Sequence, residues 1–272
     1  SLRNLTHIPE ELFLTIDGNK EKLYSINEIR DMKLKDEDWI SRSVAYSTEC
    51  SEQVVIRSLE LLNKKKKNSD IPHKIIAVAC SVAHAEDIKN LYEKHGVKST
   101  IVHSKLEDKE LEGNFKDIEN NRVDVVINVA MLGEGYDHKY LSIAAIFRPF
   151  KNLGAYVQFV GRILRYISES NNSNDNIGEI IAHQALNLEE LWEYYKKEVE
   201  KSNISKKMSE IYTDVAQYYE APYKKEIIRS KNTGIVTEIG KGYIKESTYI
   251  STEILKDAEE KNNKDRENIE QL

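Results

Sequence analysis

The segment with the clearest chemical potential is residues 158–165, which read QFVGRILR. If this segment is helical, Gln158, Arg162 and Arg165 share one face, because they are spaced by four and then three residues. Two guanidinium groups on one face suit a phosphate group that is being transferred, since arginine stays charged and binds oxygens in pairs. Gly161 would let another element approach the helix closely. Taken alone, the pattern fits two surface arginines paired with acids equally well.

Strands and helices alternate in the part of the chain that must position these residues. Five apolar runs predict strands, at residues 74–80, 100–103, 123–129, 143–147 and 177–181. Ser81 can cap the helix after the first strand, Gly96 can end it, and a later helix is expected from about Leu153 to Tyr166. This alternation predicts an α/β fold with a doubly wound parallel sheet.

Smaller elements are expected before this alternating segment. Residues 13–16 and 23–26 predict two short strands joined by a turn. A helix with one apolar face is expected over about residues 49–63. The lysine run at 64–67 is expected to be a solvated loop, and the alternative is a patch that contacts phosphate.

Further elements are expected after it. Asn187 and Glu190 have the spacing of a capping box and predict the start of a helix. The apolar stripe of this helix, which includes Trp192, is expected to pack in the core. Residues 233–250 look like a hairpin about Gly240, and the charge-rich tail after 251 is expected to be a frayed helix or a linker.

Three of these segments, taken in order, resemble motifs of superfamily 2 helicases. Residues 158–165 are similar to motif VI, in which a Gln or His precedes Gly-Arg and a final Arg. Residues 123–137, an apolar run that enters a glycine-containing turn and ends in Asp, are similar to motif V, and residues 77–86 resemble motif IV. The resemblance covers roughly residues 71–195. It implies the C-terminal RecA-like domain of a helicase or translocase of the P-loop NTPase class, with small flanking α+β elements.

The resemblance also implies roles for individual residues. Arg162 and Arg165 match the arginine fingers that reach the γ-phosphate of ATP, and Gln158 matches a residue that senses the nucleotide. The nucleotide-binding positions implied by the motifs are Glu134, Gly135, Asp137 and Gly161. The positions that would contact the sugar-phosphate backbone of a nucleic acid are Ser81, His103, Ser104, Ala130 and Met131.

The sequence departs from the family at two places. Many members have Arg directly after the Gln of motif VI, and Phe159 stands there in this sequence. Many have Thr near the end of the motif V strand, where Asn128 and Ala130 flank the corresponding position. The lack of that hydroxyl group puts one phosphate contact in doubt.

A complete ATPase of this class needs a phosphate-binding loop of the form G-x-x-x-x-G-K-[ST] and an acidic strand end that holds a metal. The run from Gly234 to Lys241 fits poorly, because its spacing is one residue too long and Gly242 replaces the hydroxyl residue. The acidic residues 36–38 follow a polar stretch and not a buried strand. We therefore expect ATP and Mg²⁺ to be held mainly by an N-terminal RecA-like domain. Because the chain begins with Ser1, it is expected to be a fragment without ATPase activity of its own.

The composition limits the possible partners. The 272 residues are 40% hydrophobic and 32% charged, and the formal net charge is −6, so any contact with nucleic acid must come from a local patch. DNA is expected more than RNA, by analogy with relatives that have a Gln-type motif VI. The two cysteines, Cys50 and Cys80, fit a reducing cytoplasm, and neither a membrane span nor a signal peptide is expected.

Other groups of residues have weaker functional interpretations. His73, His84, His95 and His103 with Cys80 lack the spacing of zinc ligands, so no metal site is expected. The late tyrosines could stack on bases, but we favour packing within a small helical subdomain.

Three domain segments and three functional classes follow from these patterns. We expect an inter-domain segment over residues 1–70, the RecA-like domain over 71–200, and an accessory segment over 201–272. The first function is the ATP-assisting half of a helicase. The second is a non-catalytic binding or scaffold module that kept the fold, and the third is an unrelated Rossmann-like enzyme. The third is disfavoured because the turn after the first strand, at residues 80–84, contains no glycine.

Overall fold

The core of the molecule is a seven-stranded, mostly parallel sheet. A computed structural model describes residues 1–16, 22–129, 138–170, 172–201 and 233–249, and the statements below concern these ranges. The strand order is β10-β1-β8-β7-β4-β6-β5, and only the edge strand β10 is antiparallel to its neighbour. The strands are β1 (Leu2–Ile8), β4 (Lys74–Ala79), β5 (Ser99–His103), β6 (Val125–Val129), β7 (Leu141–Ile146), β8 (Gly178–His183) and β10 (Tyr243–Tyr249).

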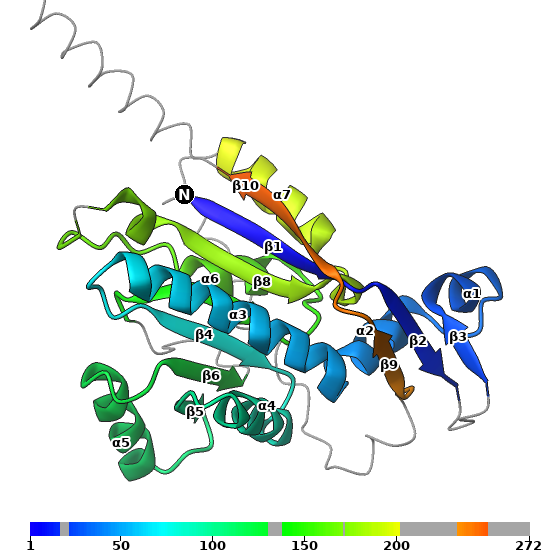
Figure 1. Cartoon of the computed structure of the whole chain (residues 1–272), viewed down its shortest axis with the longest axis horizontal. Helices are drawn as coiled ribbons and strands as arrows, with labels where there is room; N and C mark the ends of the chain where they lie inside the picture. Colours follow the sequence, from blue (N-terminus) through cyan, green and yellow to red (C-terminus); the bar gives the residue numbers. More distant parts are fainter. Residues whose placement is uncertain (17–21, 130–137, 171, 202–232, 250–272) are drawn as a thin grey trace, which may run out of the picture.

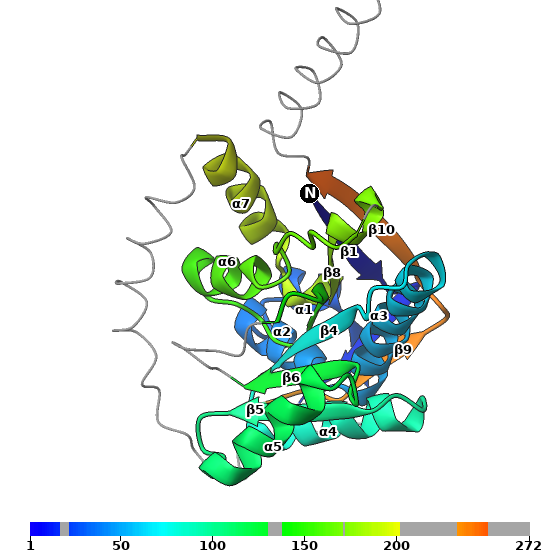
Figure 2. The same cartoon turned by 90° about the vertical axis from the view of Figure 1, so that its left-hand side faces the viewer.

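Helices cover both faces of this sheet, so its central strands are buried throughout. All six residues of β4 are buried, as a strand with two covered faces requires. Ile75 and Ala77 pack with α3 (Thr48–Asn68) and α4 (Val82–Lys94), whereas Ile76 and Val78 pack with α6 (Leu153–Gly161) and α7 (Glu189–Lys201). Figure 2 shows α6 and α7 on the opposite side of the sheet from α3. The predicted doubly wound α/β fold is therefore confirmed.

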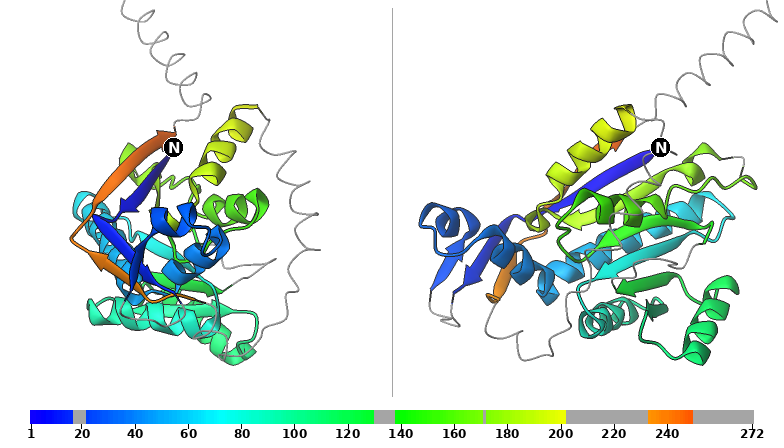
Figure 3. Two further views of the ribbon diagram at one scale, coloured as in Figure 1. Left: turned by 90° about the vertical axis from the view of Figure 1, so that its right-hand side faces the viewer. Right: turned by 180° about the vertical axis from the view of Figure 1, so that it is seen from behind.

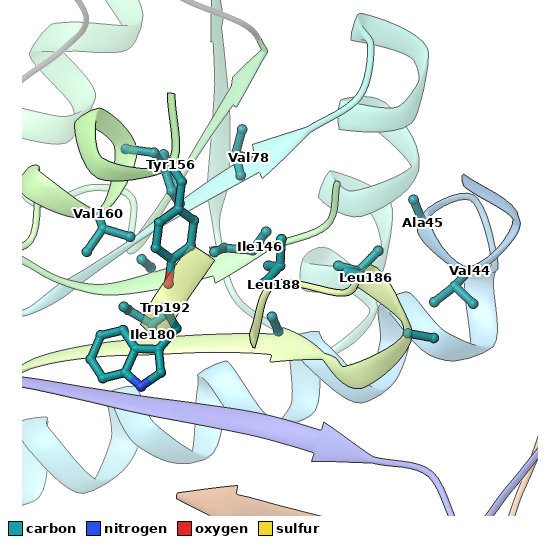
Figure 4. Close-up of a cluster of buried hydrophobic side chains, with 14 of the residues drawn as sticks. Val44, Ala45, Val78, Ile146, Tyr156, Val160, Ile180, Leu186, Leu188 and Trp192 are labelled. Atoms are coloured by element: carbon teal, nitrogen blue, oxygen red, sulfur yellow. The ribbon is translucent and has the colours of Figure 1, made fainter. Parts of the chain in front are cut away.

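The core on the α6 and α7 face is rich in aromatic residues. Tyr156 and Trp192 are each 1% exposed and pack against Ile146 and Ile180 of the sheet (Figure 4). The indole of Trp192 stacks on Tyr195 with 5.7 Å between the ring centroids. The predicted core role of the apolar stripe on α7 is thus confirmed for these side chains.

A small antiparallel sheet lies beyond the ends of β1 and β8 (Figures 1 and 3). Its order is β3-β2-β9, with β2 (Glu11–Thr15), β3 (Leu23–Ser25) and β9 (Val236–Ile239). The expected pair of short strands near the start of the chain is present as β2 and β3. The short helices α1 (Ile26–Asp31) and α2 (Glu37–Ala45) follow, and Ile29 and Trp39 join the core from them.

The segments that flank the alternating region both enter its sheet. β1 pairs in parallel with β8, and β10 pairs antiparallel with β1. The expected hairpin about Gly240 is wrong, because β9 pairs with β2 in one sheet while β10 pairs with β1 in the other. Gly240 has a positive φ of 81°, which lets the chain turn between the two sheets.

Two local expectations also need correction. The run 64–67 is not a loop, because α3 continues to Asn68, and Lys65 is buried and donates to the carbonyls of Asn174 and Ile177. Asn187 does not cap α7. It has a left-handed backbone at the end of the 3-10 helix η2 (Gln184–Leu186), and its amide donates to Glu37. In this conformation Asn187 ends one helix and cannot begin the next.

Other local signals are confirmed. Ser81 accepts a hydrogen bond from the His84 N–H and caps α4. Gly96 has a φ of 76° just after the end of that helix, as expected for a helix terminator. In the part of the chain that the structure describes, no helix is both long and apolar enough to span a membrane.

Candidate functional site

The predicted arginines lie at the end of α6 and not within it. The helix ends at Gly161, and Arg162 is its C-cap with φ −66° and ψ −25°. The N–H groups of residues 162, 163 and 164 bond to carbonyls three residues earlier, so the last turn tightens and then stops. The expected helix to Tyr166 is therefore wrong. Gln158 and Arg162 still lie one turn apart, but helical spacing does not place Arg165 on their face.

The side chains at this helix end differ in exposure. Gln158 and Arg162 are half-buried, and Arg165 is exposed. Phe159, which stands where many family members have Arg, is only 5% exposed and packs near Phe150 with 5.9 Å between the ring centroids. The departure from the motif thus places an aromatic side chain in the core and leaves the following two arginines at the surface side of the helix end.

The end of α6 lies close to the beginning of β8. The main-chain oxygen of Ile163 and the side chain of Leu2 approach Gly178 so closely that a Cβ there would lie 3.0 Å and 2.8 Å from them. The side chain of Asn176 accepts a hydrogen bond from the Ile167 N–H at 2.7 Å. Arg162 and Arg165 are therefore anchored, through their neighbours, near the amino end of the sheet.

The predicted nucleic-acid contacts lie at the carboxyl edge of the sheet. Ala79, Val129 and His103 are register partners at the ends of β4, β6 and β5. Ser81 follows the first of these strands and Ser104 the third, so the structure brings Ser81, His103 and Ser104 to one edge, as expected. Polar groups at the carboxyl ends of parallel strands commonly form binding sites.

At the amino end of α4, the electrostatics of this edge favour an anion. The amino end of α4 begins at Ser81, and its first turn contains no acidic residue. His103 lies farther along the edge, and its Nδ1 accepts a hydrogen bond from the Lys105 N–H at 3.2 Å. Burial lowers the pKa of His103, while the nearby carboxylate of Glu110 acts in the opposite direction. The imidazole is thus expected to be mostly neutral at neutral pH.

Several predicted residues fall outside the described part of the chain. These are Ala130, Met131, Glu134, Gly135 and Asp137. Their assignments remain predictions. Among the described residues, the proposed nucleotide group (Gln158, Gly161, Arg162 and Arg165) and the proposed nucleic-acid group (Ser81, His103 and Ser104) lie toward opposite ends of the sheet.

The two rejected ATP-binding motifs have structural roles. A Cβ at Gly234 would lie 2.5 Å from the ring of Trp39, so this glycine permits close packing. The strand β10, not a helix, follows Gly240, which a phosphate-binding loop would not allow. Asp36 caps α2, and Glu37 forms an ion pair with Arg30. Neither segment offers the geometry of a phosphate or metal site.

The histidines considered for a metal site have separate partners. His73 bonds to Asp175, His95 to Glu52, and the Nδ1 of His84 accepts from the Cys80 N–H. They do not form a cluster with His103 in the described residues. The expectation of no metal site here remains a prediction for the chain as a whole.

A different cluster, which the sequence did not reveal, joins the two sheets. His7 of β1, His183 of β8 and Glu238 of β9 offer ligand atoms that lie within 4.8 Å of one another. The side chains are 0%, 1% and 2% exposed. His7 Nε2 contacts one carboxylate oxygen of Glu238, and His183 Nε2 lies 3.4 Å from the other.

The hydrogen bonds of this cluster favour a proton network over a metal centre. The Nδ1 of His183 accepts a hydrogen bond from the Ala185 N–H at 3.1 Å. A neutral imidazole in this arrangement has its proton on Nε2, where a metal would need a lone pair. Burial alone would raise the pKa of Glu238, but the adjacent imidazoles of His183 and His7 outweigh it and lower the pKa to about 2. The carboxylate is therefore ionised and anchors β9 to the main sheet.

Comparison with known proteins assigns the central part of the chain. Residues 54–167 match the family model described as the helicase conserved C-terminal domain. Over residues 54–167 the chain is thus similar to the C-terminal domain of superfamily 2 helicases. The matched segment begins within α3 and ends just after the arginines, so it includes both candidate groups of this helicase domain. Superfamily 2 proteins are generally ATP-dependent helicases.

Individual relatives match only this part. UvrABC system protein B of Methanobrevibacter smithii is 29% identical over 126 residues, which is 43% of this chain and 19% of the relative. The 51.5 kDa protein of Lactococcus phage (isolate 7-9) is 29% identical over 93 residues, or 34% of this chain and 21% of that protein. The chain thus spans about a fifth of the length of these curated relatives.

Solved structures of helicases are also similar to the helicase domain. Dbp5 of S. cerevisiae, bound to RNA and ADP BeF3, is 17% identical, covers 55% of this chain and 37% of its own, and gives a TM-score of 0.42. The helicase domain of Pyrococcus furiosus Hef is 20% identical, covers 48% of this chain and 24% of its own, and gives a TM-score of 0.35.

Proposed function

We propose that this chain is the ATP-assisting half of a superfamily 2 helicase or translocase. In this proposal ATP and Mg²⁺ are held mainly by a second RecA-like domain outside these residues. Arg162 and Arg165 contact the γ-phosphate across the gap between the domains, and Gln158 responds to the nucleotide. The observation that supports this most is the match to the helicase C-terminal domain, which ends at two arginines placed at the end of α6.

The residues present suit that division of work. The sequence offers no phosphate-binding loop, so this chain supplies guanidinium groups and not the main phosphate cradle. When bound, the metal would neutralise charge on the phosphate oxygens. The arginines stabilise the charge that redistributes over those oxygens as the phosphoryl group is transferred. Glu134, Gly135, Asp137 and Gly161 complete the proposed nucleotide surface.

The carboxyl edge of the sheet is the proposed nucleic-acid surface. Ser81 follows β4 there, and His103 and Ser104 lie at the end of β5. The strand β6 lies between these two strands, and Ala130 and Met131 follow β6 in sequence. We propose DNA as the natural substrate because motif VI here has Gln, and oligonucleotides of the same sequence in DNA and RNA form test this choice. RNA is the alternative substrate, and the similar Dbp5 structure contains RNA. Stronger binding of the RNA form would contradict the DNA proposal.

The arginine assignment is tested in the full-length protein. Arg162→Ala or Arg165→Ala is expected to lower kcat roughly a hundredfold with little change in nucleotide affinity, because the contact matters chiefly in the transition state. Arginine fingers contribute about 10³–10⁵ in rate, and here two arginines share the task. Lys at either position is expected to rescue poorly, since a point charge cannot replace a planar fork.

A matched control is Arg122→Ala, which removes one exposed arginine that pairs with Asp117. It is expected to leave kcat unchanged. Steady-state nucleic-acid-stimulated ATPase measurements decide the matter. An unchanged kcat in both arginine variants would reject the catalytic role and favour a non-catalytic scaffold that kept the fold.

A further inference from the structure

Arg148 leaves the sheet beside the amino end of α4. The Phe147 N–H donates to the carbonyl of Val78 at 3.1 Å, which carries the β7–β4 pairing to the carboxyl edge. The Cys80 thiol in turn lies 3.9 Å from the carbonyl oxygen of Phe147. Because Arg148 follows Phe147 and Ser81 follows Cys80, the arginine and the helix cap leave neighbouring strands side by side.

The guanidinium of Arg148 is held in place without an acidic partner among the residues that the structure describes. Its Cζ lies 5.5 Å from the centroid of the Phe150 ring, and its Nε donates to the Pro149 carbonyl at 3.4 Å. The side chain is half-buried, and its two terminal nitrogens neither bond to a described residue nor are buried. In contrast, Arg57 and Arg122 each bind a carboxylate.

This environment fits the recognition of an external anion. Stacking on Phe150 restricts the side chain and so reduces the entropy lost when a ligand binds. The two terminal nitrogens remain available as a planar donor pair, which matches the oxygens of a phosphate. The adjacent first turn of α4 contains no acidic residue and contributes the positive end of the helix dipole.

The position of Arg148 also extends the proposed nucleic-acid surface. Strands β7, β4, β6 and β5 are consecutive in the sheet. Arg148 and Ser81 follow the first and second of them, and His103 is the last residue of the fourth. At about 4.8 Å per strand, the outer two strands are roughly 14 Å apart, which is room for more than one phosphate. Within the proposed function, we propose that Arg148 binds a phosphate of the nucleic-acid backbone next to Ser81.

The salt dependence of binding tests this contact. The chain is titrated into a labelled single-stranded DNA oligonucleotide at several salt concentrations, without nucleotide. Each phosphate neutralised on a single strand contributes about 0.7 to the slope of log K against log salt. Arg148→Met, which keeps an apolar stem against Phe150, is expected to reduce the slope by about this amount and to weaken binding for every sequence tested.

The control removes the same charge at the other edge of the sheet. Arg122 precedes β6 and is 68% exposed, so Arg122→Met is expected to leave the slope unchanged. Arg148→Lys is expected to keep the slope but to bind more weakly. Equal slopes for Arg148→Met and the unmodified chain would overturn the proposal.

Two further outcomes separate this proposal from the function on which it rests. If the unmodified chain shows no salt-dependent binding, the proposed nucleic-acid function fails and Arg148 loses its ligand with it. If the unmodified chain shows salt-dependent DNA binding and Arg148→Met leaves the salt slope unchanged, the proposed function stands and the Arg148 contact is wrong. A raised KM for ATP in the full-length Arg148→Met protein, with an unchanged salt slope, would assign the phosphate to the nucleotide and also overturn it.

Discussion

Individual residues in this chain are tuned by their neighbours, and Glu238 is the clearest case. Its pKa of about 2 lies below the value of about 4.3 for an unperturbed Glu, so its ionised form is favoured by folding. A lowered carboxyl pKa stabilises the fold fully above the unfolded value, and this stability is lost as the pH falls from about 4.3 towards 2. The pKa of His183 is also lowered, chiefly by burial. Protonation of this imidazole therefore adds a loss of stability below about pH 6.5.

Replacing the carboxylate tests this account. Glu238→Gln is expected to lower the free energy of unfolding at neutral pH by about 1–3 kcal/mol, because the amide keeps one acceptor oxygen but presents an NH2 group to the second buried imidazole. It is also expected to flatten the acid limb of the stability profile. Urea unfolding between neutral and acid pH measures both effects, with Glu112→Gln, an exposed residue paired with Lys116, as the control. A chelator that lowers the unfolding midpoint of the unmodified chain would instead indicate that the cluster holds a metal.

This cluster also shows why sequence reasoning could not find every important residue. His7 and Glu238 are separated by 231 positions, and no local spacing links either of them to His183. Their proximity depends on the pairing of β1 with β8 in the large sheet, and no hydrophobic periodicity in the sequence predicts this pairing. The arginines were identifiable because their chemistry is concentrated in one short segment. Arg148 gives no such signal in the sequence, because the absence of an acidic partner among the described residues is visible only in the folded chain.

At the scale of elements, strands and helices were predicted better than their ends. The apolar runs correctly indicated β4 to β8, since a strand buried on two faces needs such a run. The end of α6 was misplaced because a 3-10 turn after Gly161 interrupts a sequence that continues to look helical. The end of α3 was misplaced in the other direction, because Lys65 is stabilised by carbonyls distant in the chain. Both errors arise from tertiary contacts that override local preference.

The helix α4 offers a way to separate stability from binding at one position. Ser81 caps this helix and is also a proposed phosphate contact. Ser81→Ala is expected to lower the free energy of unfolding by about 1 kcal/mol, because the His84 N–H loses its acceptor. Ser81→Asp also caps well, so it is expected to retain stability while its charge repels the nucleic acid. Unfolding curves and oligonucleotide titrations of both variants check this, and unweakened binding by the Asp variant would remove Ser81 from the surface.

At the scale of the whole molecule, the first and last strands of the described region pair with each other and extend the large sheet. β1 lies between β8 and β10, so residues from before and after the matched segment 54–167 complete the sheet. β2 and β9 repeat this association in the small sheet. The matched segment 54–167 thus shares one sheet with the segments that flank it, and the expected boundaries at residues 70 and 200 remain predictions about sequence segments. This arrangement leaves the helix end with the two arginines and the carboxyl edge as separate surfaces.

The two proposed surfaces lead to separate predictions for the 272-residue chain alone, one for ATP hydrolysis and one for DNA binding. It is expected to hydrolyse no ATP above background, with or without nucleic acid, because its sequence has no phosphate-binding loop for the arginines to assist. It is still expected to bind single-stranded DNA weakly, because a local anion site can act despite a formal net charge of −6. Phosphate-release assays and titrations at low and high salt measure the two properties on one preparation. ATPase activity that persists in pure chain and disappears in Arg162→Ala would show that these residues contain a complete nucleotide site, and salt-insensitive tight binding would show that phosphate contacts do not dominate.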